Sequence, residues 1–290
     1  MSADLYQTVT DRILESLEAG VAPWVKPWKS APGNGLPFNA SSGKAYRGIN
    51  VALLYAPQYA SSGWMTFNQA KTLGGHVRKG ERGSKIVFFK PFVVRDKNST
   101  DEEATRTIPL LREFTVFNVE QIEGLPAKFY AQESTEERPA HSVADAMLGL
   151  ATVRHGGDRA CYSPSVDAIQ MPNPAQFDSV SGYYATALHE LTHWTGHASR
   201  CAREYGKRFG DTAYAREELV AEMGAAFLCA RAGIDGQLQH AAYLQSWIDV
   251  LKSDKRAIVI AAAAAQKAAD FVINAAFGAV TQDAEEESAA

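Results

Sequence analysis

Apolar positions near the start of the chain recur every three or four residues, and this spacing predicts a helix that ends before Gly20. Its apolar face is formed by Leu5, Val9, Ile13 and Leu17. Residues 50–55 predict a second helix. The first fifteen residues are amphipathic and polar, so we expect no signal peptide.

The next part of the chain is rich in β-branched and aromatic residues and predicts strands. The expected elements are a strand at 64–67 with a helix that stops at Gly74, strands at 85–89 and 92–94, a polar connection at 95–107 and a returning strand at 112–119. Glycines and basic residues alternate through 76–84, which predicts a loop suited either to touching phosphate or to lying solvated as a turn.

Residues 131–142 are polar and charged without periodic apolar positions, and we interpret them as a linker between domains at 1–130 and 143–290. After the linker we expect a helix at 143–151, short strands at 161–164 and 168–172, a helix from Ser179 to Trp194 or Thr195, and a mainly helical remainder. The apolar run 257–265 is too short to span a membrane and predicts a core helix.

The helix that begins at Ser179 carries the candidate chemistry, His189-Glu190-Leu191-Thr192-His193. Residues four apart lie on one face of a helix, so the two imidazoles can bind one metal ion. Glu190 lies between them and can take a proton from a water at the metal, as in zincin metallopeptidases. The pattern predicts a metal site with Glu190 as the catalytic base.

A third metal ligand is needed, and two glutamates in the apolar segment 217–228 are the candidates. Carboxylates on such a helix are costly to bury unless something positive meets them. We expect Glu222 to bind the metal and Glu218 to orient a histidine or to be the alternative ligand. Glu217 is interpreted as a solvated surface acid. His197 lies eight residues after His189, about 12 Å along a continuous helix, too far to share one ion.

Composition is typical of a soluble enzyme, and charge differs between the two halves. The net charge of the chain is −4, but the segment from Lys26 to Lys90 holds ten basic residues and one acid. Such a basic stretch attracts polyanions. The three cysteines show no disulfide spacing, which favours a reducing cytoplasm.

Aromatic residues lie among these basic positions, beginning with Trp24 and Trp28 in a proline-stiffened segment. Basic grooves follow a phosphate backbone while flat side chains stack on unpaired bases, so the mixture favours single-stranded DNA over a duplex. Trp64 and Phe67 are more typical of core residues. The residues expected to contact DNA are Trp24, Lys26, Trp28, Lys29, Lys44, Tyr46, Arg47, Arg78, Lys79, Arg82 and Lys85.

Five segments together resemble the ArdC-type antirestriction proteins of conjugative plasmids, over nearly the whole chain. The segments are 46–50, 64–67 with Gly74 and Gly75, 78–81, 189–197 and 217–224. The resemblance implies an α+β protein with an N-terminal α/β domain that binds single-stranded DNA and a mainly helical C-terminal zincin-like metallopeptidase domain. It also implies protection of incoming conjugative DNA from type I restriction.

Three hypotheses follow from the residues and the resemblance. The first is a DNA-tethered peptidase that uses Zn²⁺, or another divalent metal such as Mn²⁺ or Co²⁺, to cleave a protein such as a restriction component. The second is a DNA-binding shield whose metal site is structural or vestigial. The third is a nuclease, which is disfavoured because nucleases usually hold two metals with clustered carboxylates. We expect no membrane partner.

Overall fold

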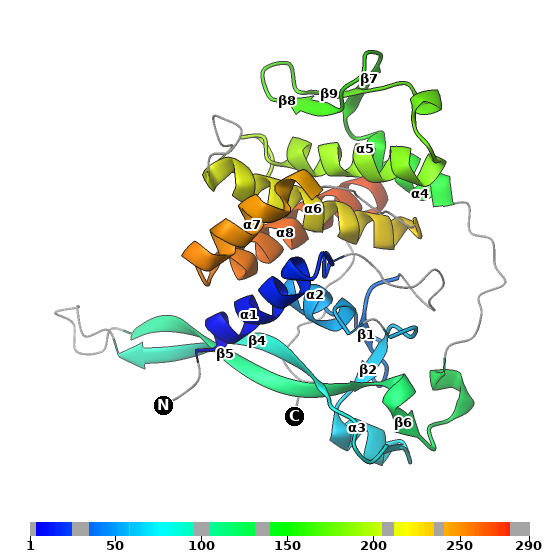
Figure 1. Cartoon of the computed structure of the whole chain (residues 1–290), viewed down its shortest axis with the longest axis vertical. Coiled ribbons are helices and arrows are strands. Elements are labelled where there is room, and N and C mark those ends of the chain that lie inside the picture. Colours follow the sequence, from blue (N-terminus) through cyan, green and yellow to red (C-terminus); the bar gives the residue numbers. More distant parts are fainter. Residues whose placement is uncertain are drawn as a thin grey trace.

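The computed structural model of the chain describes residues 4–24, 35–57, 59–95, 105–130, 140–204, 212–234 and 241–278. These residues form helices together with three small sheets, an α+β arrangement (Figure 1). The expected linker falls largely on 131–139, outside the described residues, and its last three positions belong to helix α4 (Ala140–Leu148).

The N-terminal half is built on a four-stranded sheet in the order β1-β2-β5-β4. Its strands are β1 (Phe38–Asn39), β2 (Gly63–Met65), β4 (Ser84–Arg95) and β5 (Thr105–Asn118). A two-stranded sheet of β3 (His76–Val77) and β6 (Ile122–Glu123) lies beside it, and the helices of this half are α1 (Leu5–Glu18), α2 (Ile49–Tyr55) and α3 (Phe67–Thr72).

One expected break in the strands is wrong, because β4 continues through Pro91 to Arg95. Pro91 pairs with Pro109 of β5, in a part of the sheet where β5 is no longer paired with β2. Proline lacks a backbone N–H and is tolerated in edge strands. Both strands are edges there, so the ladder can pass two opposed prolines without interruption.

The C-terminal half is a group of helices covered at one end by a three-stranded sheet (Figure 1). The helices after α4 are α5 (Val180–Thr195), α6 (Thr212–Ala232), α7 (Ala241–Ser253) and α8 (Ala257–Phe277). The sheet has the order β7-β9-β8, with β7 (Thr152–His155), β8 (Cys161–Ser163) and β9 (Ala168–Met171). The sequence predicted β8 and β9 but missed the exposed strand β7.

The two halves share one hydrophobic core. Helix α1 packs on α7 and α2 packs on α8, so apolar residues of both halves join a single cluster. Trp24 is 0% exposed and its ring meets that of Trp247 edge to face at 5.6 Å. This corrects the prediction that Trp24 contacts DNA, because its faces are covered by the core.

The segment Tyr46–Asn50 also packs against both halves. The Arg47 guanidinium forms an ion pair with Asp270 of α8, and the Gly48 N–H donates to Gln266 Oε1 at 2.9 Å. The Asn50 side chain accepts from the Val87 N–H at 2.9 Å and donates to the Val87 carbonyl at 2.8 Å, which fixes α2 against β4.

Tyr46, the first residue of this segment, is buried, and burial raises the pKa of its hydroxyl to about 12. The burial of Tyr46 argues against the prediction that it faces DNA. The Arg47 side chain is 35% exposed, so a contact of Arg47 with DNA stays a prediction.

Helix α8 is the one helix of the described ranges that is long and apolar enough to cross a membrane, judged by length and composition. Half of its most apolar window, 50%, is buried inside the protein. Its buried alanines pack closely on α6, in agreement with the predicted core helix.

Candidate metal centre

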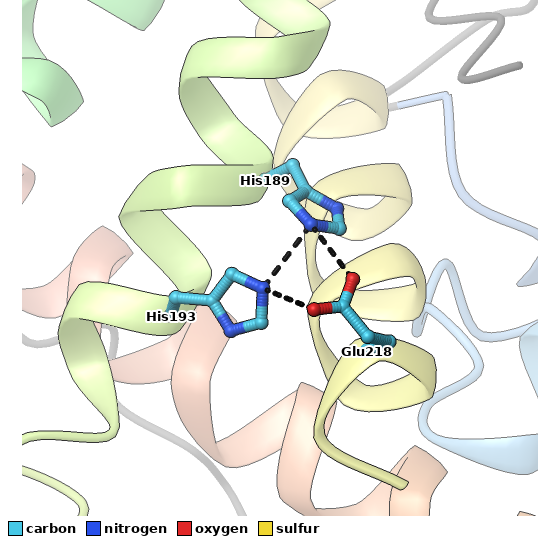
Figure 2. A group of neighbouring side chains, drawn as sticks. All are labelled: His189, His193 and Glu218. Carbon is cyan, nitrogen blue, oxygen red and sulfur yellow. Dashed lines mark hydrogen bonds and ion pairs between the residues drawn. The ribbon is translucent and has the colours of Figure 1, made fainter. Parts of the chain in front are cut away.

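Helix α5 brings His189 and His193 to one face. It begins after Ser179, whose side chain accepts from the Gly182 N–H at 3.0 Å, and it ends at Gly196, as the sequence predicted. His189 lies 4% exposed and His193 lies one turn later. Both rings point toward α6 (Figure 2).

Three side chains that could bind a metal converge between α5 and α6. The Nε2 atoms of His189 and His193 lie 3.2 Å apart, and the two oxygens of Glu218 lie 3.5 Å from one Nε2 each. Four ligands arranged tetrahedrally about 2.0–2.1 Å from zinc would be separated by about 3.3 Å. The separation of the two Nε2 atoms matches one edge of such a tetrahedron, and the Glu218 carboxylate lies close enough to both rings for the three residues to hold a single divalent ion.

The geometry favours Glu218 over Glu222 as the third ligand. The group of side chains that could hold a metal is His189, His193 and Glu218. The carboxylate of Glu222 instead faces the other ring nitrogen of His189, with 3.6 Å between Oε1 and Nδ1. The roles expected for the two glutamates are therefore exchanged in this arrangement, with Glu222 placed to orient His189.

Glu217 is buried, not solvated, and this corrects the sequence interpretation. It is 6% exposed and lies 3.1 Å from His193 Nδ1. Arg203, in the loop between α5 and α6, donates to both oxygens of Glu217 at 2.8 and 2.9 Å. Each imidazole thus has Nε2 at the ligand position and Nδ1 toward a carboxylate, the arrangement that fixes ring orientation in metal sites.

The acidic surroundings change the protonation of His193 in the metal-free protein. Burial alone would lower its pKa, but hydrogen bonds to Glu217 and Glu218 outweigh burial and raise the pKa to about 10. For the Glu218 carboxyl, burial acts in the opposite direction and would raise the pKa. Its contacts with the two histidines outweigh burial and hold the pKa of Glu218 well below its usual range. In the metal-free protein a protonated His193 therefore lies between the ionised carboxylates of Glu217 and Glu218.

Glu190 lies beside this group and beneath the sheet. It is 7% exposed, and its Oε2 accepts from the backbone N–H of Tyr162 in β8 at 2.8 Å. Strand β8 is at the edge of its sheet. The edge strand and the catalytic candidate are therefore joined directly.

Close packing between α5 and α6 depends on Gly224. A Cβ added there would lie 2.4 Å from Thr192 Cγ2, which is closer than two carbon atoms can approach. Thr192 is part of the histidine motif, so this contact sets the distance at which Glu218 meets His189 and His193.

The remaining predicted site residues divide into three groups. Lys26, Trp28 and Lys29 lie outside the described residues. Lys44, Arg78, Lys79 and Arg82 are exposed on the N-terminal half, while Lys85 forms an ion pair with Glu113 at 2.9 Å. His197 lies beyond the end of α5, bound to Ser199 at 2.8 Å and apart from the metal group, as its spacing predicted.

Comparison with known proteins separates the same two parts. A family model described as a zincin-like metallopeptidase matches residues 143–264, and one described as the N-terminal domain of anti-restriction factor ArdC matches residues 3–117. A crystal structure of the antirestriction protein ArdC from plasmid R388 is 45% identical, with a TM-score of 0.79, and the match covers 96% of this chain and 99% of that one. The chain belongs to the ArdC family. The resemblance and the two-domain α+β fold predicted from the sequence are confirmed.

A second R388 ArdC structure, described as bound to Mn(II), matches with a TM-score of 0.76 and 45% identity over 94% of this chain and 98% of that one. The uncharacterized protein y4eC of Sinorhizobium fredii is 37% identical over 93% of this chain and 91% of its own length. Two DNA primases TraC of Escherichia coli are 42% and 41% identical over 92% of this chain. The matched region makes up only 27% and 20% of those primases.

Proposed function

We propose that this ArdC-family protein binds single-stranded DNA through its N-terminal half and hydrolyses peptide bonds at a metal held in its C-terminal half. In this way it protects incoming conjugative DNA from type I restriction. The observation that carries the proposal is the convergence of two histidine Nε2 atoms and the Glu218 carboxylate beside Glu190.

His189, His193 and Glu218 would hold the metal, which we expect to be Zn²⁺, with Mn²⁺ or Co²⁺ as alternatives. The Mn(II)-bound relative supports a divalent ion. When bound, the metal polarises a carbonyl group and makes a water at the site more acidic. Glu217 lies at hydrogen-bond distance from His193 Nδ1, and Glu222 faces His189 Nδ1 at 3.6 Å. These carboxylates would keep the imidazoles turned so that Nε2, and not Nδ1, meets the ion.

Glu190 would take a proton from the attacking water and pass it to the leaving amine nitrogen. The Tyr162 N–H holds one oxygen of its carboxylate, which leaves the other available to the water. The N–H and C=O of one residue in a strand point to the same side. The Tyr162 carbonyl therefore faces the open edge of β8, where it could accept a hydrogen bond from an extended substrate backbone.

Single-stranded DNA is favoured for the N-terminal half because basic residues between Lys26 and Lys90 outnumber acids ten to one. The match to the N-terminal domain of an anti-restriction factor is consistent with this assignment. Two primases contain a similar region, so the fold also occurs in proteins named for a reaction on nucleic acid. The substrate would be a protein found near that DNA, such as a component of the restriction system.

The test is conjugation into a restricting recipient with wild type, Glu190→Ala and the matched control Glu15→Ala, together with single-stranded-DNA binding by each purified protein. Glu15 is an exposed acid on α1, a helix that packs mainly on α7 and α2, whereas the metal group lies between α5 and α6. We expect Glu190→Ala to keep DNA binding and metal binding but to lose protection, while Glu15→Ala behaves as wild type.

Protection by Glu190→Ala at the wild-type level would contradict the peptidase assignment. The protein would then act as a DNA-binding shield, and the metal group would have a structural or vestigial role.

A further inference from the structure

Phe67 is the most exposed aromatic residue that the structure describes. It is the first residue of α3, its side chain is 54% exposed, and it belongs to none of the hydrophobic clusters. Within the described ranges its ring contacts one aromatic ring, that of Phe117 on β5, with 6.5 Å between centroids and an angle of 65°. Trp64, three residues earlier, is 0% exposed, so the local fold buries one aromatic side chain and presents the other.

Phe67 is held in place by the start of its helix. The Thr66 side chain accepts from the Gln69 N–H at 3.2 Å, and Gln69 Oε1 accepts from the Thr66 N–H at 2.9 Å. This reciprocal cap fixes the backbone at the first turn. The exposed ring is therefore presented from an ordered position.

Basic residues surround the two rings. Lys71 lies four positions after Phe67 and so on the same face of α3. The loop 78–83 ends beside Phe117, because a Cβ on Gly83 would lie 3.0 Å from the Phe117 ring. Lys71, Lys79 and Arg82 are exposed, and among the described residues no carboxylate pairs with them.

The acid in this loop is already engaged. Glu81 binds Arg78 at 2.6 Å and accepts from Gln121 Nε2 at 2.9 Å, and these hydrogen bonds hold its pKa below the usual range. Gln121 is 1% exposed and also donates to the Arg82 carbonyl at 2.9 Å. A buried side chain thus fixes the loop that carries Lys79 and Arg82.

We propose that Phe67, Phe117, Lys71, Lys79 and Arg82, here called the Phe67 face, bind single-stranded nucleic acid, with Phe67 stacking on a base and the three cations contacting phosphates. An exposed ring beside exposed cations suits a single strand, because a duplex hides its base faces. The site rests on the proposed DNA-binding function and gives it a location. It also lies at the end of the molecule opposite α5 and β8, so bound DNA would leave the metal group accessible (Figure 1).

The test measures binding of the full-length protein to a labelled oligothymidylate by fluorescence anisotropy. The oligonucleotide is longer than about 16 nucleotides, so that it spans one binding site. The variants are Phe67→Ala, Phe67→Trp and Lys79→Ala with Arg82→Ala. The matched controls are Phe277→Ala, an aromatic residue that is 42% exposed on α8, and Lys267→Ala, an exposed lysine on the same helix.

We expect Phe67→Ala to weaken binding about tenfold without changing its salt dependence. We expect Phe67→Trp to bind at least as tightly as wild type, with quenching of the new indole by DNA. Removing both cations should lower the slope of log K against log salt by about 1.4, at about 0.7 for each phosphate contact on a single strand. Both controls should bind as wild type.

Two results would overturn the proposal in distinguishable ways. Wild-type affinity and salt dependence in both Phe67→Ala and the double basic variant would place the DNA elsewhere while leaving DNA binding intact. Failure of the wild-type protein to bind the oligonucleotide would refute the DNA-binding function together with this site. Because Phe67 is exposed, unchanged melting temperatures are expected and would show that the variants are folded.

Discussion

Glu217 offers a sharp test of the metal centre, because the sequence alone placed it on the surface. Its carboxylate lies between His193 Nδ1 at 3.1 Å and the Arg203 guanidinium at 2.8 Å. Replacing it with glutamine keeps the shape but removes the charge that holds both partners. We expect Glu217→Gln to bind metal more weakly by about 10- to 100-fold, the usual effect of losing a residue that orients a metal ligand.

Removing the Glu217 side chain with Glu217→Ala should also lower stability, and a double variant separates the loss of stability from the loss of metal affinity. Glu217 is 6% exposed and the Arg203 side chain 11% exposed, so Glu217→Ala leaves a guanidinium buried without its charge partner. Breaking a buried pair in this way costs about 3–5 kcal/mol of the free energy of unfolding. Glu217→Ala with Arg203→Met removes both charges and should recover part of the stability, but not the metal affinity.

The assay is metal titration by competition with a chromophoric chelator, with unfolding by denaturant on the same proteins. Glu15→Gln, at an exposed position of α1, is the matched control and should titrate as wild type. The reasoning would be refuted if Glu217→Gln bound metal within about twofold of wild type while Glu218→Gln lost it, because His193 would then need no orienting carboxylate.

Three further predictions test other contacts. Trp24→Ala should lower the free energy of unfolding by about 3–5 kcal/mol in denaturant titration, because it empties a core position against Trp247. A loss of DNA affinity without a loss of stability would contradict the burial of Trp24. Gly224→Ala should lower the free energy of unfolding by about 1–3 kcal/mol and weaken metal binding, because the added methyl group separates α5 from α6. Adding Thr192→Ser removes the methyl group that clashes and should restore part of the stability and of the metal affinity. Unchanged metal affinity in Gly224→Ala would argue against the close contact. Since the pKa of His193 is raised from 6.5 to about 10, the metal-free ring holds a proton that the metal must displace, and metal affinity should rise with pH across that interval. Calorimetry of metal binding in buffers of different ionisation enthalpy should detect the released proton. Binding heats that do not depend on the buffer would contradict the displacement of a proton.

The helix of the histidine motif could be predicted closely because its signals are local. Ser179 caps its first turn and Gly196 ends it, so its phase and both inward-facing histidines follow from the sequence. The choice between Glu218 and Glu222 could not be made in this way. They share one face of α6, and which of them meets the histidines depends on how far α6 slides along α5, a position set by the contact of Gly224 with Thr192.

Burial of Glu217 and Trp24 was missed because their partners are distant in the sequence. Arg203 reaches Glu217 from a loop, and Trp247 meets Trp24 from the other half of the chain. One signal was present for Glu217, since three glutamates within six residues of an otherwise apolar helix indicate a shared buried partner. Phe67 was judged more typical of the core, and only the tertiary structure distinguishes it from the buried Trp64.

The central claim is that His189, His193 and Glu218 hold one divalent ion while Glu217 and Glu222 orient the imidazoles. The most direct measurement is anomalous diffraction from crystals soaked with Zn²⁺ or Mn²⁺. The account predicts a single peak between α5 and α6, about 2.0–2.2 Å from both Nε2 atoms and a Glu218 oxygen for Zn²⁺. A peak bonded to Glu222 or to Nδ1 of either histidine, or no peak at this position, would contradict it.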